Sequence, residues 1–264
     1  MGLTIALLFS TPIGVLGERF TQSQEGAAEL GPLKITLGKP VLPLQYRYQT
    51  KPVANETIDL SALVGPIGDT GYDASTVGFT VMYAIRVAQA SIDLKSPPLS
   101  PWGIYSLARK YDEFEGERDN GSSIIGALMG AKAVGVYAEK DWPYASEKTP
   151  AKSIEHLFKI KDFEQCKSVV QILNALRAGK VVAAAIYVTD DFDNPGEAGV
   201  VVIKLPVERD IPGLKVIAIT GYDSKSAKFK FANDWGAQWG DHGFGQIKDS
   251  DLAELLVDGY TVDL

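Results

Sequence analysis

The order of the helical and strand-like segments is the feature that most constrains how this chain can fold. Apolar residues recur at helical spacing in the first two thirds of the sequence, whereas the last third holds short runs rich in Val, Ile and Phe. Helices are expected over 75–92, after Pro101, from Ser122 or Ser123 to Gly135, and over 169–180. Strands are expected over 181–188, 199–205, 214–223, 228–234, 243–248 and 260–264. Helices followed by strands predict an α+β protein with two sub-domains rather than an alternating parallel sheet.

Two segments stand out within this plan. The helix expected over 75–92 is apolar on nearly every face, which predicts a central, buried helix. Residues 1–50 begin with an apolar run and continue with many Gly, Pro and polar residues, so we expect an extended N-terminal arm. A cleft between the two sub-domains is the expected place for a site.

Composition excludes several functional classes. The chain has 264 residues and a net charge of −7, which argues against a general nucleic-acid binder. Its one cysteine, Cys166, cannot close an internal disulfide, and with two histidines it cannot build a Cys/His zinc cage. We therefore expect neither a metal nor another cofactor.

The apolar run at 3–17 bears on localisation. It lacks the basic start of a signal peptide, contains Pro12, and is shorter than the roughly 20 residues that span a bilayer. No signal peptide and no membrane span are expected. Together with the absence of disulfides, this suggests an intracellular or virion-associated protein.

A set of uncommon residues recurs in order between 221 and 247. Gly221, Tyr222 and Asp223 precede a strand, Asn233-Asp234-Trp235-Gly236 follows it, and Trp239-Gly240 leads to Gly243-Phe244. The segment resembles the C-terminal region of papain-like cysteine peptidases, which reads Gly-Tyr-Asp, Asn-Ser-Trp-Gly, Trp-Gly-x-x-Gly-Tyr. Residues 64–71 lie where the family has the entry to its catalytic helix, and 142–144 also fit the family pattern. Residues 100–112 and the Gly-Ser-Ser at 121–123 look like bacterial or phage-type members.

The resemblance implies a fold with two lobes. Residues 51–180 would form a helical lobe around the central helix, and residues 181–264 would form an antiparallel, β-barrel-like lobe. In this family the nucleophile is a Cys at the start of the central helix, in Gln-Gly-x-x-Gly-Ser-Cys-Trp. A His acts as the base, and an Asn orients that His.

Laid on this chain, the family motif departs at the decisive positions. Thr70 stands for the Gln, Thr76 for the Cys and Lys215 for the His, whereas Asn233 matches the Asn. The resemblance therefore predicts a degenerate site with no catalytic residue, in a pseudopeptidase that is not an enzyme. The old cleft would be lined by Thr70, Gly71, Tyr72, Thr76, Lys215, Asn233 and Trp235.

Such a chain is expected to be a structural or protein-binding component, for example of a phage particle. The N-terminal arm or the old cleft would bind a protein partner, a second copy or a larger assembly. Ser75 or Thr76 is expected to cap the helix over 75–92. In this interpretation Thr76 serves only as such a cap, and Lys215 pairs with an acidic neighbour such as Asp73.

Two other interpretations stay open. The chain could be a hydrolase that uses Thr76 with Lys215, which needs a dry pocket where the amine gives up its proton, whereas papain-like clefts are expected to be open and wet. It could instead be a regulatory decoy that binds peptides.

The remaining reactive side chains have ordinary explanations. Cys166 is expected to be a small buried hydrophobe, His242 a turn residue and His156 a surface residue. Asp190, Asp191 and Asp193 are expected in a solvated loop, with a calcium site as the alternative.

Overall fold

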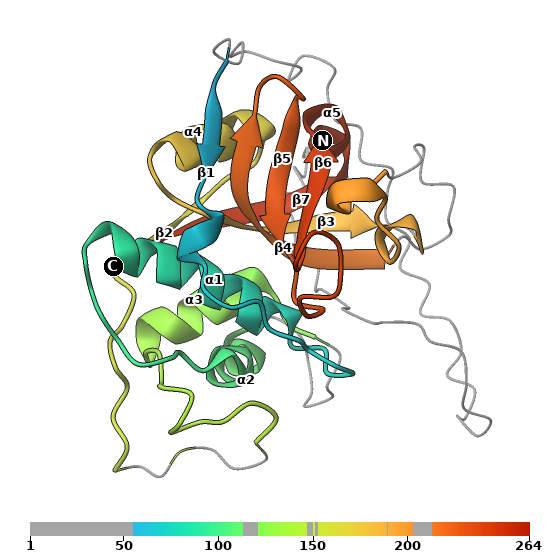
Figure 1. Ribbon diagram of the computed structural model, residues 1–264. Coiled ribbons are helices and arrows are strands. Elements are labelled where there is room, and N and C mark those ends of the chain that lie inside the picture. The colour runs from blue at the N-terminus through green and yellow to red at the C-terminus, as the bar shows by residue number, and fades with distance from the viewer. Residues whose placement is uncertain (1–54, 113–120, 147–149, 151–152, 189, 203–212) are drawn as a thin grey trace, which may run out of the picture.

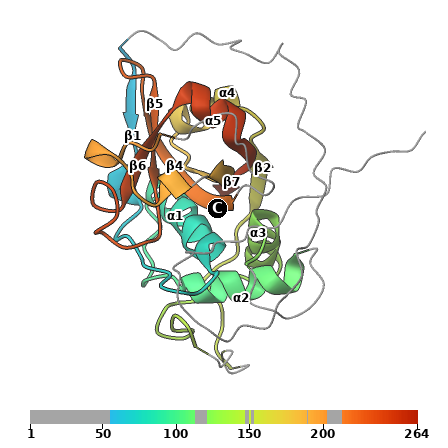
Figure 2. The same cartoon turned by 90° about the vertical axis from the view of Figure 1, so that its right-hand side faces the viewer.

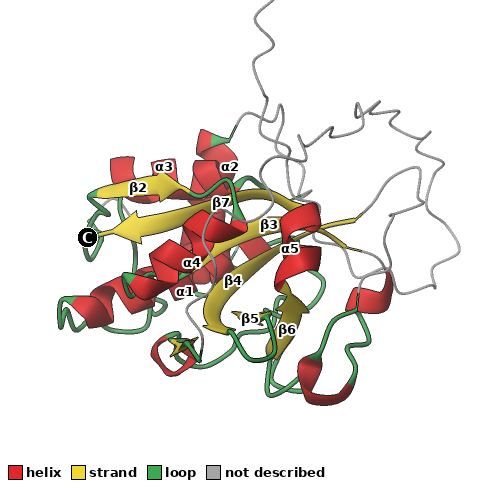
Figure 3. Cartoon of the chain, turned by 90° about the horizontal axis from the view of Figure 1, so that it is seen from above, coloured by secondary structure: helices red, strands yellow, loops and turns green. Residues whose placement is uncertain are grey.

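An antiparallel sheet of seven strands organises the molecule (Figure 1). The computed structural model describes residues 55–112, 121–146, 150, 153–188, 190–202 and 213–264, so the expected arm at 1–50 lies outside the described residues. The strands are β1 (Thr57–Asp59), β2 (Asp162–Gln165), β3 (Val182–Val188), β4 (Gly213–Asp223), β5 (Lys228–Ala232), β6 (Phe244–Lys248) and β7 (Leu256–Asp263). Their order is β2-β7-β3-β4-β5-β6, as Figure 3 shows from above, and β1 pairs with β4.

Alternating side chains of the central strands enter two different cores. Val216 and Ala218 of β4 pack with the helices α1 (Thr76–Ser91), α2 (Pro101–Tyr111) and α3 (Ile124–Ala133). Ile217 and Ile219 of the same strand pack with α4 (Val169–Arg177) and α5 (Asp249–Leu255). Figure 2 shows the first three helices on one side of the sheet and α4 and α5 on the other. One sheet therefore separates the two cores.

The helix α1 is buried, as its apolar sequence predicts. Its buried residues occupy every face of the helix, and α2 packs closely against it at Gly78. A Cβ atom at Gly78 would lie 2.2 Å from the carbonyl oxygen of Pro101, so only glycine permits this approach. Side-chain hydroxyls cap the other long helices: Ser100 Oγ accepts from the backbone N–H of Gly103, and Ser123 Oγ from that of Gly126.

The α+β fold is confirmed, and the differences from the expected elements are local. The strand expected over 199–205 is wrong for its described part, where only Val200 forms an isolated bridge, to Gln246. The helix α5 was not expected. No helix in the described ranges combines the length and the apolar character needed to cross a bilayer.

Candidate active site

Thr76 begins the central helix. It is the first residue of α1, and Ser75 occupies the N-cap position, so the expectation that Thr76 caps the helix is wrong. The Thr76 hydroxyl donates a hydrogen bond to the carbonyl oxygen of Val216 at 3.4 Å. The start of a helix favours negative charge, which suits an oxygen that becomes anionic during a reaction.

Lys215 reaches Thr76 from strand β4. Its Nζ atom donates to Thr76 Oγ1 at 3.0 Å, forms an ion pair with Asp234, and lies 4.4 Å from the centre of the Trp235 ring. The register explains the meeting: Ala218 of β4 pairs with Ala232 of β5 in antiparallel fashion, which brings the residues after β5 alongside the start of β4. The expected pairing with an acidic neighbour is confirmed, but the partner is Asp234 and not Asp73, which lies beside Tyr144.

These polar groups are almost completely dry. Thr76 and Lys215 are each 2% exposed, and Asp234 is 1% exposed. The open, wet surroundings expected for this pair are therefore not found. Burial supplies the dry surroundings that the hydrolase interpretation requires, whereas the ion pair with Asp234 favours the ammonium form of Lys215.

The segment before α1 closes over the same region. Both the backbone N–H and the hydroxyl of Thr70 donate to the carbonyl oxygen of Asp234, at 2.9 and 3.3 Å. The Tyr144 hydroxyl donates to the carbonyl oxygen of Thr70 at 2.9 Å and lies 2.7 Å from Ser75 Oγ. Burial raises the pKa of Tyr144, so this hydroxyl stays protonated. Tyr72, in contrast, is 93% exposed.

Asn233 does not contact Lys215 by a hydrogen bond. Both polar atoms of its amide are buried without a hydrogen-bond partner in the part of the chain that is described. Trp235 packs against Phe192 and Trp239, with ring centres 5.5 and 6.1 Å away. The structure thus brings Thr70, Thr76, Lys215 and Trp235 together. Asn233 does not fill the orienting role that the resemblance implies for it.

Two residues of the site were missed. The motif includes Asp234, which departs from the Ser of the family pattern, but the resemblance implies no role for it. An acidic residue directly after Asn233, the implied orienting residue, is the signal that would identify it. Tyr144 was seen as part of a matching Trp-Pro-Tyr motif, yet its link to Ser75 depends on tertiary packing that the sequence does not display.

The other reactive side chains lie elsewhere. Cys166 is buried, as expected, and burial followed by the charge of Glu164 raises the pKa of its thiol to about 11. His242 is in a turn with a positive φ of 53°, and His156 is exposed. Asp193 is exposed, and the described residues contain no cluster of three or more His, Cys, Asp or Glu side chains that could hold a metal ion.

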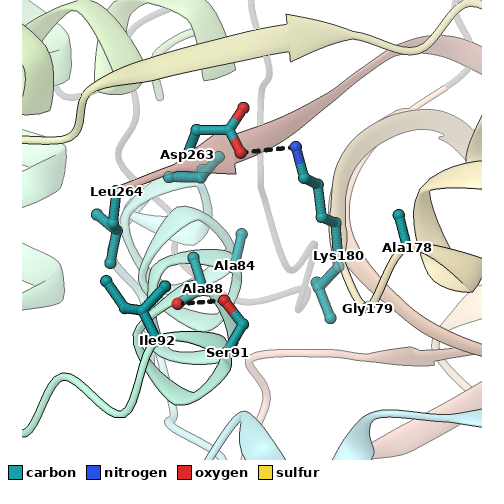
Figure 4. A pocket seen from close by; sticks show the side chains of 11 residues that line it. Ala84, Ala88, Ser91, Ile92, Ala178, Gly179, Lys180, Asp263 and Leu264 are labelled. Atoms are coloured by element: carbon teal, nitrogen blue, oxygen red, sulfur yellow. Dashed lines mark hydrogen bonds and ion pairs between the residues drawn. The ribbon is translucent and has the colours of Figure 1, made fainter.

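A small pocket lies at the opposite end of α1 (Figure 4). Ala84, Ala88 and Ser91 of that helix line it, together with Ile92, 178–181 and 262–264. Lys180 and Asp263 form an ion pair of 2.6 Å at this pocket. None of the expected cleft residues contributes to it.

Solved structures share the fold. A cysteine protease of Xylella fastidiosa, xylellain, aligns with a TM-score of 0.70 at 20% identity, over 80% of this chain and 87% of that chain. Digestive procathepsin L 3 of the Tenebrio molitor larval midgut aligns with a TM-score of 0.67 at 17% identity, over 82% and 72%. The Carica candamarcensis cysteine protease CMS1MS2, in complex with E-64, aligns with a TM-score of 0.61 at 16% identity, over 78% and 97%. No curated protein matches the sequence.

The family model described as papain family cysteine protease matches residues 112–257, which is more than half of the chain. This match contradicts the expectation that the chain is not an enzyme, because the matching family is one of proteases and no observation here demonstrates inactivity. The sequence, the two-sided sheet and the buried helix α1 agree with this assignment. The chain belongs to the papain family of cysteine proteases.

Proposed function

We propose that this protein is a hydrolase of peptide bonds in which the Thr76 hydroxyl is the nucleophile and Lys215 is the base. The observation that carries the proposal is the 3.0 Å contact between Lys215 Nζ and Thr76 Oγ1 in a dry site at the start of α1. A nucleophile within hydrogen-bond reach of a base, with the base held by a third group, is the general arrangement of covalent catalysis.

The chemistry would proceed through an ester. Thr76 Oγ1 forms a bond to the carbonyl carbon while its proton passes to neutral Lys215. The C–N bond then breaks, and Lys215 returns the proton to the leaving amine. Water hydrolyses the resulting ester in the second half of the reaction.

The resting contacts set two requirements on this reaction. Lys215 is the donor to Thr76 Oγ1, while the hydroxyl donates to Val216, so the amine must lose a proton before it can act as a base. Hydrolysis should therefore increase from neutral toward alkaline pH. Thr76 is also only 2% exposed, so a substrate must displace neighbouring side chains, and we expect slow acylation.

The test is hydrolysis of a fluorogenic peptide library by the wild type and by Thr76→Ala. We expect the substitution to remove turnover to background, a loss on the order of 10³-fold or more, and to abolish an acyl adduct located on Thr76 by mass spectrometry. Thr80→Ala is the matched control, since Thr80 is buried on the same helix and also donates to the carbonyl oxygen of Val216 at 3.4 Å. Turnover that survives Thr76→Ala, or a wild type without turnover at alkaline pH, would overturn the proposal.

A thiol reagent distinguishes this site from a cysteine nucleophile. Because the Cys166 thiol is buried and its pKa is raised to about 11, it is neutral under ordinary assay conditions. We expect iodoacetamide to leave hydrolysis by the native protein unchanged. Inactivation in step with carboxamidomethylation of Cys166 would contradict the assignment to Thr76.

A further inference from the structure

We propose that Asp234 is the positioning residue of Lys215: its carboxylate fixes the amine opposite Thr76 and sets the pH at which the amine can accept the hydroxyl proton. This inference rests on the proposed function and names the group that controls its base.

The contacts of Lys215 come from different directions and converge on one atom. Asp234 forms the ion pair with Nζ, Thr76 Oγ1 accepts from it at 3.0 Å, and the Trp235 ring covers it at 4.4 Å. The side chains of Lys215 and Asp234 are 3% and 1% exposed. A long lysine side chain is otherwise free to adopt many rotamers, so these contacts hold the amine in place.

Asp234 occupies the place that the family resemblance would give to its neighbour. Both residues follow the end of β5 at Ala232, and Asp234 lies in a bend. The Asn233 amide has no hydrogen-bond partner among the residues described, whereas the Asp234 carboxylate contacts the amine. A carboxylate suits an ammonium partner, as an amide suits a histidine.

Among the described residues, Tyr83, Tyr144 and Asp73 are titratable groups near this pair. Burial is the largest cause that raises the pKa of both Tyr83 and Tyr144, and the charge of Asp234 adds to it, so both hydroxyls remain neutral where hydrolysis would be measured. The charge of Arg86 lowers the pKa of Tyr83 in part, and Asp73 raises the pKa of Tyr144 further. In the proposed reaction, the proton that is lost toward alkaline pH comes from Lys215.

The charge of Asp234 has a predictable effect on the base. A carboxylate in contact with an amine favours the ammonium form, by about 1–3 pH units for a close pair. Asp234→Asn keeps an acceptor oxygen and nearly the same volume but removes the charge. In this variant both the loss of the Lys215 proton and the rise of kcat/KM should move to lower pH by about 1–3 units.

The experiment follows these two quantities separately. One is kcat/KM against pH for peptide hydrolysis. The other is the 13C chemical shift of Lys215 Cε against pH in lysine-labelled protein, assigned with Lys215→Met. We expect the two midpoints to fall together in Asp234→Asn and to stay near the wild-type values in Asp234→Glu. Asp241→Asn is the charge-matched control, because Asp241 is 52% exposed and lies outside the site.

The outcomes separate the inference from the proposed function. A Cε midpoint that does not move in folded Asp234→Asn, or a Cε midpoint that moves while the kcat/KM profile stays in place, overturns the inference. A Cε midpoint that moves in a protein without hydrolysis supports the effect of Asp234 on the protonation of Lys215 and refutes the proposed function. If Asp234→Asn does not fold, the wild type still tests the inference. Near neutral pH its Lys215 Cε should show the chemical shift of an ammonium group, and the chemical shift of a neutral amine would overturn the inference.

Discussion

The two ends of helix α1 carry the same pair of side chains in opposite surroundings. At its start, Lys215 and Asp234 are 3% and 1% exposed, whereas near its end Lys180 and Asp263 are 33% and 40% exposed. Water screens the second pair and hydrates both of its partners. The first pair has exchanged that hydration for contacts with Thr76 and Trp235. The same two residue types therefore make a surface contact at one end and a constrained polar site at the other.

Removal of one partner should have the largest effect on this comparison. Asp234→Ala leaves an amine buried without its counter-charge, and such changes cost about 3–5 kcal/mol of unfolding free energy. Asp263→Ala should cost less than about 1 kcal/mol, because Lys180 is then hydrated. Urea unfolding of both variants measures the difference. Equal losses would show that burial does not distinguish the two pairs.

Removal of both partners should reverse part of the first effect. Replacing a buried ion pair by apolar residues of similar size is often neutral or stabilising, because no charge is left without hydration. We expect Lys215→Met with Asp234→Leu to recover most of the stability lost in Asp234→Ala. A double-mutant cycle on Lys180 and Asp263 should give a coupling of only about 0.2–1 kcal/mol. A double variant at the buried site that is no more stable than the single one would contradict the prediction.

A third ion pair, also partly exposed, should show the smallest effect on stability. Lys230 contacts Asp59 at 3.1 Å, with side chains 30% and 48% exposed. Partial burial alone would raise the pKa of Asp59, but hydrogen bonds from Ser61 and the Lys230 ammonium outweigh it and lower that pKa.

Because the folded-state pKa of Asp59 is lowered, its contribution is present above the unfolded-state pKa and is lost as the pH falls through the folded-state pKa. Asp59→Asn should therefore cost less than about 1 kcal/mol near neutral pH, and this cost should disappear as the pH falls through the lowered folded-state pKa of Asp59. Urea unfolding at a series of pH values tests this. A cost that persists in acid would assign it to packing rather than to charge.

The sequence predicted those features that apolar spacing reports directly. The buried helix over 75–92 and the strand at 214–223 could be identified because each is a mainly apolar run of helix or strand length. The run at 199–205 misled, because Val201 is buried in the core around α4 without joining a strand in its described part. The helix α5 has two buried leucines, Leu252 and Leu255, which are too few to establish a period.

The site was predictable in its members but not in its contacts. Thr70, Thr76 and Lys215 follow from motif spacing, and the structure brings them together. The partner of Lys215 does not follow, because it depends on which of two adjacent residues faces β4 after the antiparallel pairing of Ala218 with Ala232. The resemblance favoured Asn233 as the orienting residue. An ammonium in place of an imidazole changes which neighbour is the better partner.

The alternation of side chains along β3 and β4 has a consequence for how the chain can fold. Alternate residues of each strand pack into the core around α1, and the residues between them pack into the core around α4 and α5. A fragment that ends before β3 lacks the surface on which α1 packs, and a fragment that begins there exposes one face of its strands. Neither half has a complete interior, so unfolding should be a single cooperative event in which both cores are lost together.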